Sequence, residues 1–383
     1  MKIKLINIYS FPVRAKTDWL VLEMISENNI KGYSELTMSN YYERDELIST
    51  VKKFIKVLSG KEIENDNQLK EILEENKKES LIFNTSISGI RSACSDIFSK
   101  TEKIPMNIYL TRGENKKASS SVELYANINR SLLPSNDGPV DRSPESFFNM
   151  AKKAKNAGFK KIKCAPFDGF KSEEYENKKF ISGGLDKVSI LSKNLKNEIE
   201  ILVDCHSKFN LDESKIVEKK LYDLDINWFE EPMNPLKNLG ELKKLKKLIK
   251  GKLVGGEEFY GTNKFYNLVK NNFLDIVMPD IKYCGGIEEA MEIGKKLGSI
   301  SNSCFSIHCP SGPISLAGSA HVTSALSSEL PLEHAVFEIE DRHEFVYPNE
   351  NIKNGKYIFT NDLGIGVVPN FSKENKHLLK DYL

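Results

Sequence analysis

The chain has 383 residues, long enough to bury a large core and to form two domains. Its 55 Lys and Arg residues balance 54 Asp and Glu residues, so net charge gives no reason to expect binding to nucleic acid or to a membrane surface. No apolar run is long enough to span a bilayer, and the six cysteines form no C-x-x-C pair. We therefore expect a cytoplasmic protein with reduced thiols.

Residues 1–118 are predicted to form a small α+β domain. Apolar runs with partial alternation predict three strands, over 2–13, 19–26 and 30–36. Helical patterns follow over 43–60 and 69–99, and residues 92–98 are apolar on one helical face.

Residues 119–345 alternate between strand and helix candidates. The strand candidates are 122–129, 160–165, 198–205, 226–231, 252–258, 275–280, 304–308 and 334–340. The helix candidates are 144–157, 185–195, 214–221, 239–249, 262–271, 287–297 and 313–326. This periodicity fits a parallel βα barrel or a doubly wound sheet, but polar residues that recur at strand ends favour the barrel. Residues 346–383 have no place in the barrel and are expected to pack on the first domain.

Three acidic residues each close a strand candidate of the second domain: Asp204, Glu230 and Glu257. Their spacings, 26 residues from 204 to 230 and 27 from 230 to 257, match one βα unit. A parallel barrel would bring these side chains to one rim. Three carboxylates in one pocket repel each other, and a divalent cation that prefers oxygen ligands would relieve the repulsion. The sequence therefore predicts one bound Mg²⁺ in a metal-dependent enzyme.

Two lysines, Lys161 and Lys163, close the strand candidate 160–165, and strand alternation places both on one face. In a barrel mouth, each positive charge would lower the pKa of the other, which suits one lysine to act as a general base. Taken alone, this motif favours the alternative, a solvated start of a lysine-rich strand.

Asp280 and His308 each end a strand candidate, 28 residues apart, which favours an Asp–His dyad over a helix cap and an isolated histidine. His206 should share the inward face of Asp204, either as a second acid/base or as a rim residue. Glu338 closes the last strand candidate, where it could contact a substrate carboxylate or form a surface salt bridge. The other histidines are interpreted as structural: His321, His334, His343 and His377.

The ordered set of motifs resembles the enolase superfamily, and most closely its mandelate racemase branch. The motifs are 161–163, 204–206, 229–232, 255–258, 278–280 with 285–286, and 306–308. Residues 1–118 are similar to the capping domain of that family, so the resemblance covers nearly the whole chain.

The resemblance implies an α/β fold, a modified TIM barrel (β/α)7β with an N-terminal α+β capping domain. The capping domain would comprise residues 1–118 completed by 346–383, and the barrel would comprise 119–345. One Mg²⁺ per subunit would lie on Asp204, Glu230 and Glu257 in a homo-oligomer, with an octamer as one form.

The resemblance also implies residue roles. Lys163 would be the base on one face of the substrate, tuned by Lys161, and His308, oriented by Asp280, would be the acid/base on the other face. Glu338 matches the position that helps to stabilise the enolate. Asn129 is a further candidate for substrate binding at the barrel mouth, as are residues 14–19, 41–42 and Arg130.

The activity implied is removal of the proton next to a carboxylate, and dehydration of a sugar acid to a 2-keto-3-deoxy acid is the leading expectation. Mandelate racemase itself has D-x-N, whereas some dehydratases of the branch carry D-x-H, as at Asp204 and His206. Either His206 or His308 would then protonate the leaving hydroxyl. The rival is a racemase or epimerase of a 2-hydroxy acid. A Schiff-base aldolase using Lys163 and a non-catalytic sugar-acid binding protein are weaker alternatives.

Overall fold

A four-stranded antiparallel sheet begins the fold. The computed structural model describes residues 1–14, 17–38, 41–75, 78–114, 119–132, 141–372 and 377–382. In the sheet, the strand order is β15 (His377–Tyr382), β1 (Ile3–Arg14), β2 (Thr17–Ser26) and β3 (Lys31–Glu35). Asn29, with φ 59°, turns the chain from β2 into β3. The three predicted strands are therefore present.

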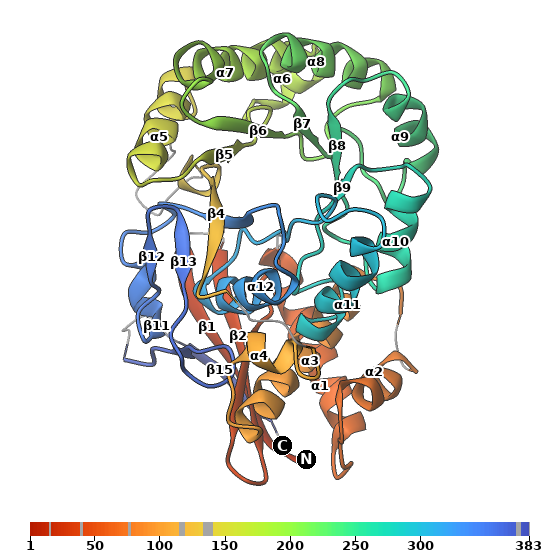
Figure 1. The fold of residues 1–383 in the computed structure, drawn as a ribbon, viewed down its shortest axis with the longest axis vertical. Helices are drawn as coiled ribbons and strands as arrows, with labels where there is room; N and C mark the ends of the chain where they lie inside the picture. The colour runs from red at the N-terminus through yellow and green to blue at the C-terminus, as the bar shows by residue number, and fades with distance from the viewer. Residues whose placement is uncertain are drawn as a thin grey trace.

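Helices cover one face of this sheet and bury its apolar side chains (Figure 1). They are η1 (Tyr41–Glu43), α1 (Arg44–Leu58), α2 (Asp66–Glu74) and α3 (Leu81–Thr101), followed by α4 (Met106–Leu110). Asn65 and Ser80 start α2 and α3 by accepting hydrogen bonds from the backbone N–H groups of Gln68 and Phe83. Helix α3 is buried along most of its length, because it also contacts helix α11 (Ile287–Gly298) of the second domain.

Parallel strands form the second domain. Six neighbours follow in chain order: β4 (Ser121–Asn127), β5 (Lys161–Cys164), β6 (Glu200–Asp204), β7 (Trp228–Glu230), β8 (Lys252–Gly255) and β9 (Ile276–Val277). Strand β10 (Leu332–Ala335) pairs in parallel with β4. Residues 304–308 lie between β9 and β10, since Ser306 N donates to Val277 O at 3.2 Å and Glu333 N donates to Ile307 O at 3.4 Å. Hydrogen bonds therefore continue around an eight-membered ring, which is a (β/α)7β barrel.

Helices surround the ring of strands on its outer side (Figure 1). They are α5 (Pro144–Asn156), α6 (Ser172–Glu176), α7 (Lys179–Leu195), α8 (Leu211–Asp223), α9 (Leu239–Lys246), α10 (Thr262–Lys270), α11 (Ile287–Gly298) and α12 (Pro313–Leu326). Short 3-10 turns are η2 (Arg130–Leu132) and η3 (Arg342–Phe345). Asn210 and Glu213 form a capping box at the start of α8. Inside the ring, a separate apolar cluster includes Tyr125, Trp228 and Met278.

The C-terminal segment is divided between the two domains. Strand β15 pairs with β1 of the first sheet, whereas β13 (Lys356–Ile358) pairs with β4 of the barrel and carries β12 (Ile352–Lys353) at its edge. Strands β11 (Val346–Tyr347) and β14 (Val368–Pro369) form a separate two-stranded sheet. The segment predicted to pack on the first domain thus also extends the barrel sheet.

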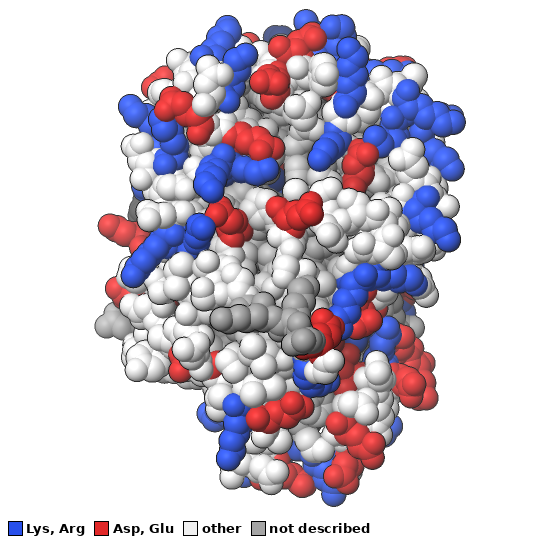
Figure 2. Space-filling model, in the orientation of Figure 1, with Lys and Arg blue, Asp and Glu red and all other residues white. Residues whose placement is uncertain are grey.

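The surface carries both signs of charge. In Figure 2, basic and acidic side chains are interspersed over the face that is shown. Within the described ranges, no helix combines the length and the apolarity that crossing a membrane would require. The six cysteines are buried and free.

Candidate active site

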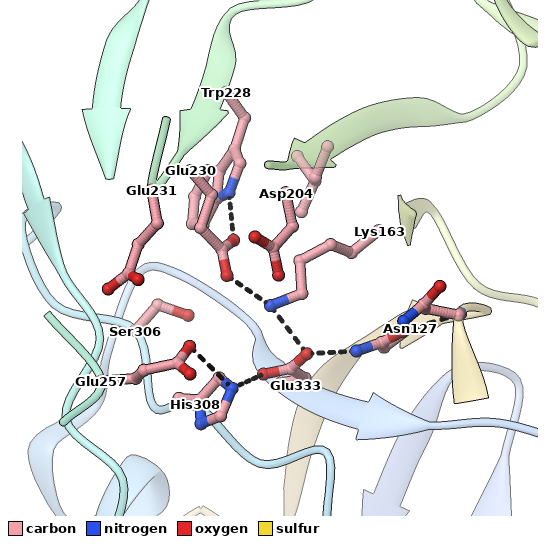
Figure 3. A network of polar contacts seen from close by, with 12 residues as sticks. Asn127, Lys163, Asp204, Trp228, Glu230, Glu231, Glu257, Ser306, His308 and Glu333 are labelled. Atoms are coloured by element: carbon pink, nitrogen blue, oxygen red, sulfur yellow. Dashed lines mark hydrogen bonds and ion pairs between the residues drawn. The ribbon is translucent and has the colours of Figure 1, made fainter. Parts of the chain in front are cut away.

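The strand register brings the predicted acids to one rim of the barrel. Asp204 and Glu230 are direct partners at the ends of β6 and β7, and Glu257 follows the end of β8 by two residues. The Asp204 and Glu230 side chains are buried. Figure 3 shows the carboxylates of all three pointing into the same space as that of Glu231. The sequence spacing therefore placed these residues on neighbouring strand ends.

Lys163 is buried beneath this rim between two carboxylates (Figure 3). Its Nζ lies 2.6 Å from Glu230 Oε1 and 2.8 Å from Glu333 Oε1, and 1% of its side chain is exposed. Burial lowers the pKa of Lys163, but the charges of Glu230 and Glu333 outweigh burial and raise the pKa well above its ordinary value. A neighbouring lysine was expected to lower this pKa, but the nearest charged partners of Lys163 are the carboxylates of Glu230 and Glu333.

Lys161 lies away from the site. It occupies the first residue of β5, where it pairs with Glu200 at the first residue of β6, and the two groups are 2.6 Å apart. Two residues of strand, about 6–7 Å, separate it from Lys163. The prediction that Lys161 tunes Lys163 and binds substrate is therefore not supported by any contact of its side chain.

Glu333 is a site residue that the sequence analysis missed. It lies in β10, where Oε1 accepts from Asn127 Nδ2 at 2.7 Å and Oε2 accepts from Cys309 N at 2.9 Å. The expected strand 334–340 is displaced, because β10 ends at Ala335. Glu338 therefore lies beyond the strand and pairs with Arg130 at 2.5 Å instead of closing the barrel. The spacing of 25 residues from His308 to Glu333, close to the other βα units, was the available signal.

His308 and Asp280 meet as a dyad. His308 Nδ1 lies 2.9 Å from Asp280 Oδ2, and Nε2 lies 3.0 Å from Glu257 Oε2. Lys282 Nζ also contacts Asp280 Oδ2, at 2.6 Å. Although burial lowers the pKa of His308, Glu257, Glu333 and Asp280 together raise it to about 9. Asp280 thus fixes one ring nitrogen and leaves the other directed at the carboxylate cluster.

His206 is held by two carboxylates. Nε2 lies 2.9 Å from Asp204 Oδ2, and Nδ1 contacts Asp168 Oδ2 at 2.5 Å. Asp168 is not part of any of the sequence motifs. Glu231 was also missed: it accepts from Gly256 N at 2.8 Å and from Ser207 Oγ at 3.3 Å, so it ties together the loops that follow β6 and β8.

One pocket of about 260 Å³ brings several of these groups together. Its described lining comprises Thr17, Thr37, Met38, Asn127, Asn129, Arg130, Asp168, Asp204, His206, Glu257, Glu258, Lys282, Tyr283, His308, Pro310 and Ser311. His206 follows the third strand of the ring and His308 ends the seventh, so they approach the pocket from opposite sides. Lys163 and Glu230 are not among the described lining residues. Of the cap segments proposed for substrate binding, Thr17 lies at this pocket, and residues 15–16 fall outside the described residues.

The donor set at the rim suits a hard divalent cation. Burial raises the pKa values of Glu230 and Glu257, and the charge of Asp204 adds to both shifts. This excess of negative charge is what a bound Mg²⁺ would relieve. In the structure, Lys163, His206 and His308 hold the three carboxylates, and the described residues contain no group of three side chains arranged as metal ligands. The residues present fit a Mg²⁺ site in donor type, and a shared ion stays a prediction.

Comparison with known proteins agrees with the enolase resemblance of the sequence motifs. Residues 148–373 match the model of the family "Enolase C-terminal domain-like". Arabinonate dehydratase of Saccharolobus solfataricus is 26% identical over 90% of this chain and 86% of its own length. D-xylonate dehydratase of Haloferax volcanii is 24% identical over 50% of this chain and 46% of its own length.

Solved structures share the fold. A member of the enolase superfamily from Salmonella Typhimurium superposes with a TM-score of 0.85 at 21% identity, covering 99% of this chain and 100% of its own. A mandelate racemase/muconate lactonizing enzyme from Sulfitobacter sp. gives a TM-score of 0.83 at 17% identity, covering 97% and 94%. With its capping domain, its (β/α)7β barrel and the matched model over residues 148–373, this chain belongs to the enolase C-terminal domain-like family.

Proposed function

We propose that this protein is a lyase that dehydrates a sugar acid to a 2-keto-3-deoxy acid. One observation carries the proposal: two carboxylate-bound histidines, His206 and His308, line opposite sides of one pocket beside the predicted metal ligands. Dehydration needs a base for the α-proton and an acid for the β-hydroxyl, and this arrangement supplies both. The dehydratase relatives act on arabinonate and xylonate, which supports a sugar acid as the substrate.

In this proposal, His308 removes the α-proton. Asp280 accepts the hydrogen bond from Nδ1–H, so Nε2 is the nitrogen that takes the proton. His206 then gives a proton to the β-hydroxyl oxygen, the carbon–oxygen bond breaks, and water leaves. Because the two rings lie on opposite sides of the pocket, proton and hydroxyl would leave from opposite faces of the substrate.

We assign Lys163 a structural role instead of the predicted role of general base. Its charge holds Glu230 and Glu333 in place, and its absence from the described pocket lining favours His308 as the base. The ion pairs with Glu230 and Glu333 keep this amine charged, which opposes a Schiff-base aldolase, in which the amine would have to be neutral. Asp204, Glu230 and Glu257 would hold Mg²⁺. When bound, the ion supplies positive charge that lowers the cost of negative charge on the substrate carboxylate.

The test is to incubate the protein with Mg²⁺ and a panel of sugar acids in D₂O, and to follow keto-acid formation and the α-proton by NMR. We expect keto acid from at least one monoacid, and we expect H308N and D280N to form it at least about 100-fold more slowly. Deuterium at an inverted α-carbon without keto acid would instead identify an epimerase. Neither product from any acid would reject both activities, and would favour a binding protein.

A further inference from the structure

We propose that Asp168 is a positioning residue that orients His206 for proton donation to the leaving hydroxyl. The inference rests on the proposed dehydration and extends it to a residue that neither the motifs nor the family resemblance identified. Asp168 lies in the turn after β5, 38 residues before His206, and contacts it from the end of the strand next to β6.

The contacts of Asp168 fix the histidine ring from one side. Asp168 Oδ2 lies 2.5 Å from His206 Nδ1, and Oδ1 lies 3.2 Å from Lys208 Nζ. With both oxygens engaged, the carboxylate has little freedom to rotate. A carboxylate that accepts a hydrogen bond at Nδ1 requires the proton there, so Nε2, which lies 2.9 Å from Asp204 Oδ2, is the nitrogen directed toward the predicted metal ligands.

The turn that carries Asp168 is itself anchored. Three successive carbonyl oxygens before it accept hydrogen bonds from three side chains: one in the segment before α5, one in α6 and one in α7. Arg142 donates to Ala165 O at 2.8 Å, Lys187 to Pro166 O at 3.0 Å, and Tyr175 to Phe167 O at 3.1 Å. Phe167 also packs edge-on against Phe209, with ring centroids 4.9 Å apart. Asp168 therefore stands on a rigid support despite its position in a loop.

The backbone of His206 points to the same role. His206 and Ser207 have φ values of 44° and 59°, a left-handed conformation that costs a non-glycine residue about 1 kcal/mol or more. Two hydrogen bonds maintain it: His206 N donates to Asp204 Oδ1 at 2.9 Å, and Ser207 N donates to Glu231 O at 2.7 Å. The conformation keeps the ring within reach of both Asp168 and the pocket.

The chemistry of the step balances with these residues alone. The proton on Nε2 of His206 moves to the β-hydroxyl oxygen, and the electron pair of the breaking carbon–oxygen bond leaves on that oxygen as water. The ring is then neutral and keeps its proton on Nδ1, where Asp168 accepts it. The pair Asp168–His206 thus repeats the pair Asp280–His308 on the other side of the pocket.

The experiment separates the two halves of the reaction. In D168N, which keeps the shape but not the acceptor carboxylate, keto-acid formation should fall about 100-fold in kcat, with KM changed less than about threefold. Exchange of the α-proton with D₂O, which needs only His308, should stay within about threefold of wild type. D168E keeps the carboxylate and should recover part of the lost dehydration. D212N makes the same chemical change at an 86% exposed side chain paired with Lys215 and should behave as wild type.

The outcomes are distinct. A dehydration rate of D168N within about threefold of that of wild type would overturn the role of Asp168. Equal losses in the rates of dehydration and of α-proton exchange in both Asp168 variants would overturn it as well. Circular dichroism and thermal melting establish that each variant is folded, and if D168N does not fold, the comparison rests on D168E. The inference then requires slower dehydration with unchanged exchange. If wild-type protein gives neither keto acid nor exchange, the proposed function fails instead.

Discussion

Lys163 and Glu333 form a buried ion pair that spans strand β4 at the barrel mouth. Lys163 lies in β5 and Glu333 in β10, which are the two parallel neighbours of β4, and Nζ lies 2.8 Å from Oε1. Asn127, at the end of β4 between them, donates to the same Glu333 oxygen at 2.7 Å. The pair therefore joins the start and the end of the barrel, and Glu230 adds a second negative partner for the lysine.

Removal of this ammonium should destabilise the protein strongly. K163M would leave Glu230 and Glu333 buried without a cation, which costs about 3–5 kcal/mol in the free energy of unfolding. The double variant K163M/E333Q should recover part of that loss. K161M is the matched control, because the Lys161–Glu200 pair is partly exposed and contributes less than about 1 kcal/mol. Urea denaturation gives the free energy of unfolding of all three variants. Equal values for K163M and K161M would contradict a stabilising role of the buried ion pairs of Lys163.

Much of the site could be predicted because strand ends in a parallel barrel meet at one rim. The spacing of acids and of the Asp280–His308 pair located side chains that the structure brings close together. Strand boundaries were the weak point. The expected strand 334–340 began two residues after Leu332, the first residue of β10, and this shift moved the choice from Glu333 to Glu338.

Two other features were outside the reach of sequence patterns. Alternation correctly placed Lys161 and Lys163 on one face, but it carries no information about height along the barrel, and the first lysine lies at the far end of its strand. Asp168 lies in a loop, 38 residues from its partner His206. No periodicity links such a pair, because the contact depends on how the turn after β5 is anchored in three dimensions.

Chelation should abolish activity reversibly. Removal of divalent cations leaves the substrate carboxylate without a positive partner at Asp204, Glu230 and Glu257, and added Mg²⁺ should restore keto-acid formation. Saturating Mg²⁺, at about 100 times its dissociation constant, should also stabilise the fold by about 2.7 kcal/mol, seen as a rise in melting temperature. D204N and E257Q should lose that rise, whereas E200Q, at the far end of β6, should keep it. Full activity after dialysis against EDTA would contradict the assignment of a Mg²⁺ site.

The cap and the barrel are linked by Glu35. This buried residue ends β3, and its carboxylate accepts from Gly312 N at 2.8 Å and from Ser315 N at 3.1 Å, at the start of α12. E35Q would turn an amide N–H toward one of these donors and should lower the free energy of unfolding by about 1–3 kcal/mol. E27Q, at an exposed turn of the same sheet, should have no effect within about 0.5 kcal/mol. Unchanged stability of E35Q in urea would show that the cap docks without this contact.

His321 should make stability fall as the pH is lowered. Burial in α12 lowers the pKa of His321 to about 4, and its Nδ1 accepts from Asn107 N at 3.1 Å, which requires an unprotonated nitrogen. The unfolded chain binds the proton at an ordinary pKa of about 6.5, so protonation favours unfolding between pH 6.5 and 4. At pH 5 the loss from this residue is about 2 kcal/mol relative to pH 7.5.

H321Q, which keeps an acceptor but does not titrate, isolates that contribution. Its free energy of unfolding should be lower than that of wild type at pH 7.5, because the packing against Phe359 is altered. Between pH 7.5 and pH 5 it should lose about 2 kcal/mol less than wild type, since the carboxylates that titrate in both proteins cancel in the comparison. Parallel pH dependence of the two proteins in urea unfolding would mean that His321 is not held neutral in the folded state.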